Sequence, residues 1–120
     1  MGARLLKISV VYFVIGVLLG MYMSMSQMFT QIGVHAHINL LGWVSLALAG
    51  LIYHLFPQAA ESRLGVWHFW LHNIGLPVMM IGLFFFMQGH KAMEAAIIIG
   101  SIVTIIGIIL FAVNVWRNVR

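Results

Sequence analysis

Four long runs of apolar residues, separated by short polar segments, constrain this chain of 120 residues more than any other feature. They cover residues 5–28, 34–56, 65–87 and 92–116. Each run meets the roughly 20 residues that an α-helix needs to cross the hydrocarbon core of a bilayer. Hydrophobic residues make up 63% of the chain and charged residues 7%, which leaves too little polar surface to cover a water-soluble globule. We therefore expect an all-α integral membrane protein, folded as a single four-helix bundle over residues 1–120.

The basic residues predict the orientation of these helices. A four-span layout places a single basic residue, Lys91, on one side of the membrane and the other five basic residues on the opposite side. Those five are Arg4, Lys7, Arg63, Arg117 and Arg120. Because Lys and Arg are enriched in cytoplasmic segments, we expect both termini in the cytoplasm and a location in the inner membrane of a bacterium. The formal charge of +4 sits at segment ends and not in a basic run, so it favours lipid headgroups and argues against a nucleic-acid partner.

Two histidines, His35 and His37, stand one residue apart in the stretch "QIGVHAHINLLGW" at the start of the second apolar run. Residues two apart on an α-helix differ by about 200° in direction and about 3 Å in height. The two imidazoles therefore point to opposite flanks, where one metal ion cannot easily bind both but two separate acceptors can. Ionisable side chains inside a membrane span are candidates for function, because each is costly to bury without a partner. Simple hydrogen bonding at the helix end is the alternative interpretation.

The two flanks of this helix differ below the histidines. Asn39 and Gly42 follow His35, and small residues there let another group approach the backbone closely, most often a neighbouring helix. Leu41 follows His37 and begins an apolar wall suited to a large hydrophobic ligand, another helix or lipid.

Residues 33–89 resemble the tenth and eleventh helices of cytochrome c oxidase subunit I, the core subunit of the heme–copper oxidases. The tenth helix of that family carries a histidine-any-histidine pair, then a glycine, then an aromatic-rich end that closes on Phe-Pro. This chain has "HAH", Gly42 and "AGLIYHLFP" in the same order. The next helix of the family opens on a His-Phe-Trp phrase followed by a glycine, as "WHFWLHNIG" does here.

This resemblance implies a role for each histidine of the pair. In the family, the first histidine binds the high-spin heme of the oxygen site and the second binds the low-spin heme, on opposite flanks of one helix. His35 matches the first and His37 the second, so the resemblance implies that both are axial ligands of heme iron, with heme b as the cofactor. Asn39, Leu41 and Gly42 then become expected heme contacts.

The chain also departs from the family. A complete subunit is much longer, and its copper-site and cross-linked His/Tyr motifs are absent from this sequence, so we do not expect this chain alone to reduce oxygen. Its four helices resemble one arc of the family's pseudo-threefold arrangement, which predicts a homo-oligomer, with a homotrimer favoured. In a closed ring, His35 of one protomer can face His37 of its neighbour across one heme. The expected function is that of a b-type cytochrome that transfers electrons or binds a diatomic gas, with a quinol or a cytochrome as redox partner.

His68 and His72, in the third apolar run, have several possible roles. His68 and His72 share one helix face at i and i+4, which suits a proton relay, a heme contact, a second metal site or plain hydrogen bonding. If the second and third helices form a tight antiparallel hairpin, His72 lies level with Gly50, far below the His35 and His37 pair.

The methionines of "MYMSMSQM" support an alternative function. Helical projection predicts that Met21, Met25 and Met28 share one face, and thioethers are soft ligands suited to Cu(I) or to a His/Met heme. A Cu(I)-handling membrane protein is therefore the main alternative, although methionine is also an ordinary apolar filler.

A noncatalytic assembly subunit or a small transporter is the third class. It is favoured by the fourth apolar run, whose small residues resemble a surface for close helix packing. These are Gly100, Ser101, Thr104 and Gly107.

Overall fold

The computed structural model describes all 120 residues and contains only helices. Four helical segments are long and apolar enough to cross a membrane, at Gly2–Ser26, Ile32–Leu55, Arg63–Met87 and Lys91–Asn118. This confirms the prediction of an all-α protein with four helices that are long and apolar enough to cross a membrane. The elements are α1 (Gly2–Ser26), α2 (Ile32–His37), the π-helix η1 (Ile38–Val44), α3 (Ser45–Leu55), α4 (Pro57–Glu61), α5 (Arg63–Met87), the 3₁₀-helix η2 (Lys91–Met93) and α6 (Glu94–Asn118).

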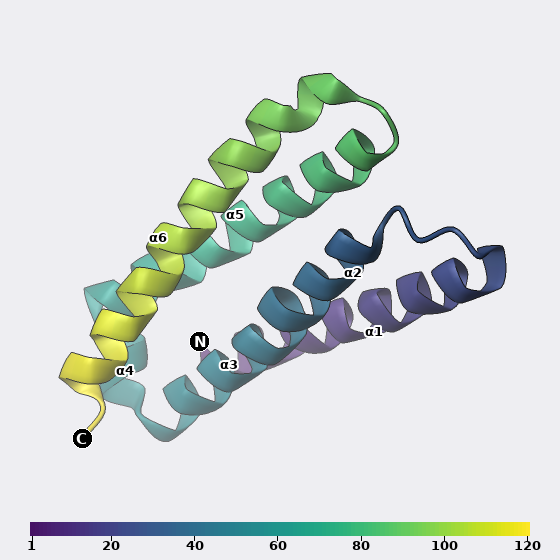
Figure 1. Ribbon diagram of the computed structural model, residues 1–120. Helices are drawn as coiled ribbons and strands as arrows, with labels where there is room; N and C mark the ends of the chain where they lie inside the picture. Colours follow the sequence, from purple (N-terminus) through teal and green to yellow (C-terminus); the bar gives the residue numbers. More distant parts are fainter.

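The helices are arranged as two antiparallel hairpins (Figure 1). One hairpin pairs α1 with the second span, which is the continuous run of α2, η1 and α3. The other pairs α5 with α6, and the short helix α4 connects the two hairpins. Many large apolar side chains on the outer faces are exposed, as is appropriate for surfaces that face hydrocarbon in place of water.

Small residues hold the α5–α6 hairpin together. A Cβ atom added at Gly100 of α6 would lie 2.5 Å from the backbone nitrogen of Met79, and one added at Gly75 of α5 would lie 2.6 Å from Oγ1 of Thr104. A Cβ atom added at Gly107 would lie 3.1 Å from the backbone nitrogen of His72. Such contacts are possible only where side chains are absent, so the prediction that this part of α6 is a close-packing surface is confirmed.

The second span is not a uniform α-helix. In η1, directly after the two histidines, the backbone N–H of Ser45 donates to the carbonyl oxygen of Leu40, five residues back, and the Ser45 hydroxyl donates to the same oxygen at 2.6 Å. A π-helix of this kind takes up one additional residue inside an α-helix and often lies at a functional site. The apolar run predicts an uninterrupted α-helix here, and the π-helix is a departure from that prediction.

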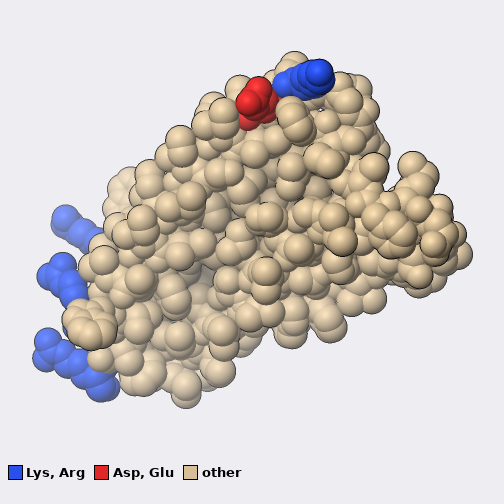
Figure 2. All heavy atoms as spheres, in the orientation of Figure 1, with Lys and Arg blue, Asp and Glu red and all other residues tan.

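Charged side chains gather at the two ends of the molecule (Figure 2). A group of Lys and Arg side chains lies at the end where the C-terminus is found in Figure 1, and another basic side chain lies at the opposite end beside an acidic one. Between these ends, the visible face of the molecule is uncharged. The charges are therefore distributed as they are in a protein whose middle section lies in a bilayer.

Candidate functional site

His35 contacts α1 through its ring nitrogen Nδ1. That nitrogen lies 2.9 Å from the carbonyl oxygen of Gly16. Because a carbonyl oxygen can only accept, Nδ1 carries the proton and donates, and Nε2 of the neutral ring keeps its lone pair. The amide of Asn39 lies 3.4 Å from the same Nδ1 but donates instead to the backbone carbonyl of His35, at 2.8 Å.

Glycines of α1 make room for this arrangement. A Cβ atom added at Gly20 would lie 2.8 Å from Cε1 of the His35 ring, and one added at Gly16 would lie 2.7 Å from Oδ1 of Asn39. The half-buried His35 and Asn39 therefore lie directly against the backbone of α1. One turn lower, the group close to Gly42 is the ring of Tyr12, since an added Cβ would lie 2.5 Å from its Cγ. Within one chain, α1 thus covers the flank that carries His35, Asn39 and Gly42.

His37 also carries its proton on Nδ1, but the carbonyl oxygen that accepts it belongs to its own helix. Its Nδ1 donates to the carbonyl oxygen of Gly33, one turn back in the same helix, at 2.7 Å. Its Nε2 therefore also keeps a lone pair. The side chain is exposed on the surface of the hairpin, and Leu41, one turn below it, is half-buried. A group that approaches from outside the chain can reach His37.

The two histidines are consequently alike in chemistry and different in surroundings. A hydrogen bond that fixes Nδ1–H to a backbone carbonyl orients the ring and leaves Nε2 as the acceptor, which is the usual arrangement of histidines that bind metal. No group of three or more His, Cys, Asp or Glu side chains lies together in a way that could hold a bare metal ion. A heme brings its own equatorial nitrogens and requires only one or two axial ligands from the protein, so this donor set fits a heme better than a bare ion.

His68 and His72 belong to a separate, buried hydrogen-bond chain. Both side chains are 1% exposed. His72 donates from Nε2 to the carbonyl oxygen of Leu41 at 2.9 Å, so its Nδ1 accepts from Nε2 of His68 at 3.1 Å. Nδ1 of His68 in turn accepts from the hydroxyl of Tyr53 at 2.8 Å. Every ring nitrogen of the two histidines is engaged, which leaves no lone pair for a metal ion in this arrangement.

The chain of hydrogen bonds continues into the packing of α4 and α6. The amide of Asn114 lies 3.4 Å from the Tyr53 hydroxyl and donates to the carbonyl oxygen of Ala59 at 2.9 Å. Its oxygen accepts from Ser62 at 2.9 Å and from Asn118 at 2.7 Å. Sequence reasoning missed Tyr53 and Asn114 as members of this network, although a lone asparagine in the apolar run of α6 is a signal that could have found it.

The expected register of His72 was wrong. A tight hairpin predicts that His72 lies level with Gly50, whereas its imidazole reaches the carbonyl oxygen of Leu41, one turn below His37. The residues after Phe56 form helix α4 in place of a tight turn, and the carbonyl oxygens of Ala59 and Ala60 pack against Gly65 near the start of α5. The register of a tight hairpin therefore does not apply to these two helices.

The methionines do not form the single face that was predicted. Helix α1 ends at Ser26, and Gln27 takes the left-handed backbone conformation with φ 56°, so Met28 lies outside the helix. Met25 is 76% exposed and Met21 is also exposed on the outer surface. The prediction that Met28 continues the face of Met21 and Met25 is wrong, because the helix stops before it.

Comparison with known proteins assigns no family to this chain. No family model, curated protein or solved structure matches it.

Proposed function

We propose that this chain is a b-type membrane cytochrome that transfers electrons, with His35 and His37 as axial ligands of heme. The observation that carries the proposal is that both histidines donate from Nδ1 to a backbone carbonyl oxygen, at 2.9 and 2.7 Å. Each ring therefore offers the Nε2 lone pair that iron requires. When bound, heme supplies a one-electron iron couple.

The chain's own residues hold these ligands in place. The Gly16 carbonyl fixes the tautomer and the orientation of His35, and the absence of a side chain at Gly20 gives the ring its space. The Gly33 carbonyl does the same for His37. Oriented ligands of this kind lose less freedom when iron binds, and a carbonyl partner makes the imidazole more basic.

We further propose that the heme site is shared between chains of a homotrimer. His35 and His37 lie on opposite flanks of one helix, so a single heme cannot take both from one chain. Because His37 is exposed, its side chain is accessible to a heme held by a neighbouring chain. Closed cyclic symmetry repeats such a contact between chains and leaves no contact surface unpaired. Two histidines on one iron leave no open position, which favours electron transfer over the binding of a diatomic gas.

The same proposal includes the setting of the protein. Five of the six basic residues lie in segments at the end that holds both termini, which supports cytoplasmic termini in a bacterial inner membrane. A quinol or a soluble cytochrome is the proposed redox partner, and lipid surrounds the spans.

Optical spectra of the purified protein, oxidised and then reduced with dithionite, test the proposal. We expect a Soret band that shifts on reduction and a sharp α band. His35→Ala and His37→Ala should each give high-spin spectra or lose heme. His54→Ala and His90→Ala, which change exposed histidines elsewhere, are matched controls that should leave the spectrum unchanged. A colourless preparation would refute heme binding, and stoichiometric copper in that preparation would support the Cu(I) alternative instead.

A further inference from the structure

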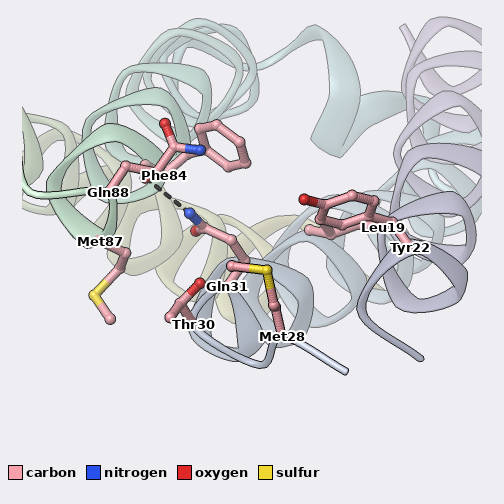
Figure 3. A pocket seen from close by; sticks show the side chains of 8 residues that line it. All are labelled: Leu19, Tyr22, Met28, Thr30, Gln31, Phe84, Met87 and Gln88. Carbon is pink, nitrogen blue, oxygen red and sulfur yellow. Dashed lines mark hydrogen bonds between the residues drawn. The ribbon is translucent and has the colours of Figure 1, made fainter. Parts of the chain in front are cut away.

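A cavity of about 550 Å³ lies at the end of the molecule opposite to α4, between α1, the residues that precede α2, and the last turn of α5. Its lining includes Tyr22, Gln31, Phe84 and Gln88. Figure 3 shows the Gln31 side chain between Phe84 of α5 on one side and Tyr22 of α1 on the other. No charged side chain lines this cavity.

Gln31 has an unusual hydrogen-bonding state in this cavity. Its side chain is 4% exposed, and its amide nitrogen donates to the carbonyl oxygen of Phe84 at 3.0 Å. That bond fixes which end of the amide is nitrogen, because a carbonyl oxygen can only accept. The other end, Oε1, is the one buried side-chain nitrogen or oxygen atom in the chain without a hydrogen-bond partner. A buried acceptor without a donor is unfavourable, so a ligand whose O–H or N–H group reaches Oε1 would gain a hydrogen bond there.

An apolar groove continues from this cavity along the membrane-facing side of α1 and α5. Leu19 and Phe84 also line a second cavity of about 240 Å³, whose lining is entirely hydrophobic. Ile15, Met80 and Ile81 are shared between that cavity and a third of about 510 Å³, which extends to Tyr12 and Asn73. From Gln88 to Asn73, α5 rises about 22 Å at 1.5 Å per residue. The groove therefore has a polar end, at Gln31 and Gln88, and an apolar path that is long enough for a hydrocarbon chain.

We propose that this groove binds an isoprenoid quinol, with its ring beside Gln31 in the cavity that Phe84 and Tyr22 also line, a hydroxyl group that donates to Oε1 of Gln31, and its tail along α1 and α5. The two aromatic side chains suit a flat ring. The uncharged lining offers no partner for a phosphate headgroup, which argues against a phospholipid. Neither His35 nor His37 lines the groove. The quinol's role as electron donor rests on the proposed heme function, but its binding does not.

The hydrogen-bonding state of Gln31 makes the proposal selective. The free atom of Gln31 is an acceptor, and only the reduced form of the ligand carries the hydroxyl that can donate to it. The oxidised quinone offers carbonyl oxygens and leaves Oε1 unpaired. A buried site that requires a donor discriminates strongly against an analogue that lacks it. The groove should therefore prefer the quinol over the quinone.

Titration of the full-length protein in detergent, without oxygen, tests this preference. The probes are decylubiquinol, decylubiquinone and dioctanoylglycerol, and binding is measured by calorimetry. We expect decylubiquinol to bind at least about tenfold more tightly than decylubiquinone. Equal affinity for the two redox forms would overturn the proposal. Equal or tighter binding of dioctanoylglycerol would reassign the groove to a hydroxyl-bearing lipid and would overturn it as well.

Three variants locate the binding. Gln31→Leu should reduce the affinity for decylubiquinol to that for decylubiquinone, whereas Gln88→Leu, a matched change in the same cavity, should keep the preference. Ile81→Trp, a change at an exposed residue that lines the apolar groove but not the cavity of Gln31, should weaken both probes to the same extent. It keeps the proposal testable if Gln31→Leu does not fold. Unchanged binding in Ile81→Trp would refute the groove as the site of the tail.

The same titration separates this inference from the proposed heme function. In protein with His35→Ala and His37→Ala together, the preference for decylubiquinol should remain, because neither histidine lines the groove. Colourless wild-type protein that keeps this preference would refute only the heme proposal. Heme-containing wild-type protein without the preference would refute only the quinol site.

Discussion

His35 and His37 both donate from Nδ1 to a glycine carbonyl oxygen, but the carbonyl belongs to α1 for His35 and to the histidine's own helix for His37. The tautomer of His35 therefore depends on how two helices pack. The tautomer of His37 depends only on the turn that precedes it. A change in α1 should consequently affect the His35 ring and leave the His37 ring in place.

Substitution of Gly20 tests that difference. In Gly20→Leu, the new side chain occupies the space of the His35 ring, because even a Cβ atom would lie 2.8 Å from its Cε1. We expect heme spectra like those of His35→Ala, with the low-spin signal reduced or absent. Val17→Leu, at an exposed position of the same helix, is the control. A low-spin spectrum in Gly20→Leu equal to that of wild type would show that the α1 contact does not position this ligand.

Mixing of the two histidine variants tests the shared site. If His35 and His37 bind one heme from neighbouring chains, a ring that contains His35→Ala and His37→Ala chains rebuilds an intact pair at some interfaces. Co-expression of the two should then restore part of the low-spin signal that each lacks alone. A co-expressed sample whose spectrum is the average of the two single variants would contradict a site shared between chains.

The buried hydrogen-bond chain should contribute to stability. Tyr53→Phe removes the hydroxyl that donates to His68 at 2.8 Å and leaves a buried ring nitrogen without its donor. We expect a loss of about 1–3 kcal/mol in the free energy of unfolding, measured by denaturant titration in detergent micelles. Tyr22→Phe changes an exposed tyrosine and serves as the control, with an effect close to zero. Equal stability of Tyr53→Phe and wild type would show that this contact is energetically neutral.

Close packing of α6 on α5 gives a second stability prediction. Gly100→Val places a branched side chain where a Cβ atom would lie 2.5 Å from the backbone nitrogen of Met79, so the two helices must separate. We expect a lower melting temperature and a larger exposed surface for protease. Ile99→Val, at an exposed neighbouring position, should retain wild-type behaviour. A stable Gly100→Val protein would contradict the packing.

Labelling of single cysteines tests the orientation. The chain contains no cysteine, so Arg120→Cys and Lys91→Cys each introduce one unique thiol. An impermeant maleimide added to intact cells should label Lys91→Cys and spare Arg120→Cys until the membrane is opened. The reverse pattern would place both termini outside.

Only some of these features could be predicted from the sequence. The four spans follow from run length and hydropathy, and the contact surface of Gly100 and Thr104 follows from residue size, because both properties are local. The end of α1 before Met28 was missed, since it depends on the left-handed backbone of Gln27 and not on the apolar pattern. The hydrogen bond from His72 to Leu41 depends on how α4 sets the register between α5 and the second span. The spacing of residues within one helix carries no information about that register.

The burial of Gln31 was missed for a similar reason. A glutamine at the start of an apolar run looks like an interfacial residue, and only its bond to Phe84, 53 residues later in the chain, draws it inside. Features that depend on contacts between two distant segments could therefore not be predicted from the sequence, whereas features that depend on one segment could.

The π-helix Ile38–Val44 has an angular consequence for the whole second span. An α-helix turns about 100° per residue, so a regular α-helix of the same residues would point His37 about 100° away from the direction that it has here relative to the residues after Ser45. The length and hydropathy of the span do not reveal such an insertion, but it sets the direction in which His37 points while Leu46 and Tyr53 stay inside the hairpin. A single deletion within this segment would let a regular α-helix form with His37 still in its present direction, whereas an uninterrupted α-helix that kept every residue would turn His37 by roughly a quarter-turn.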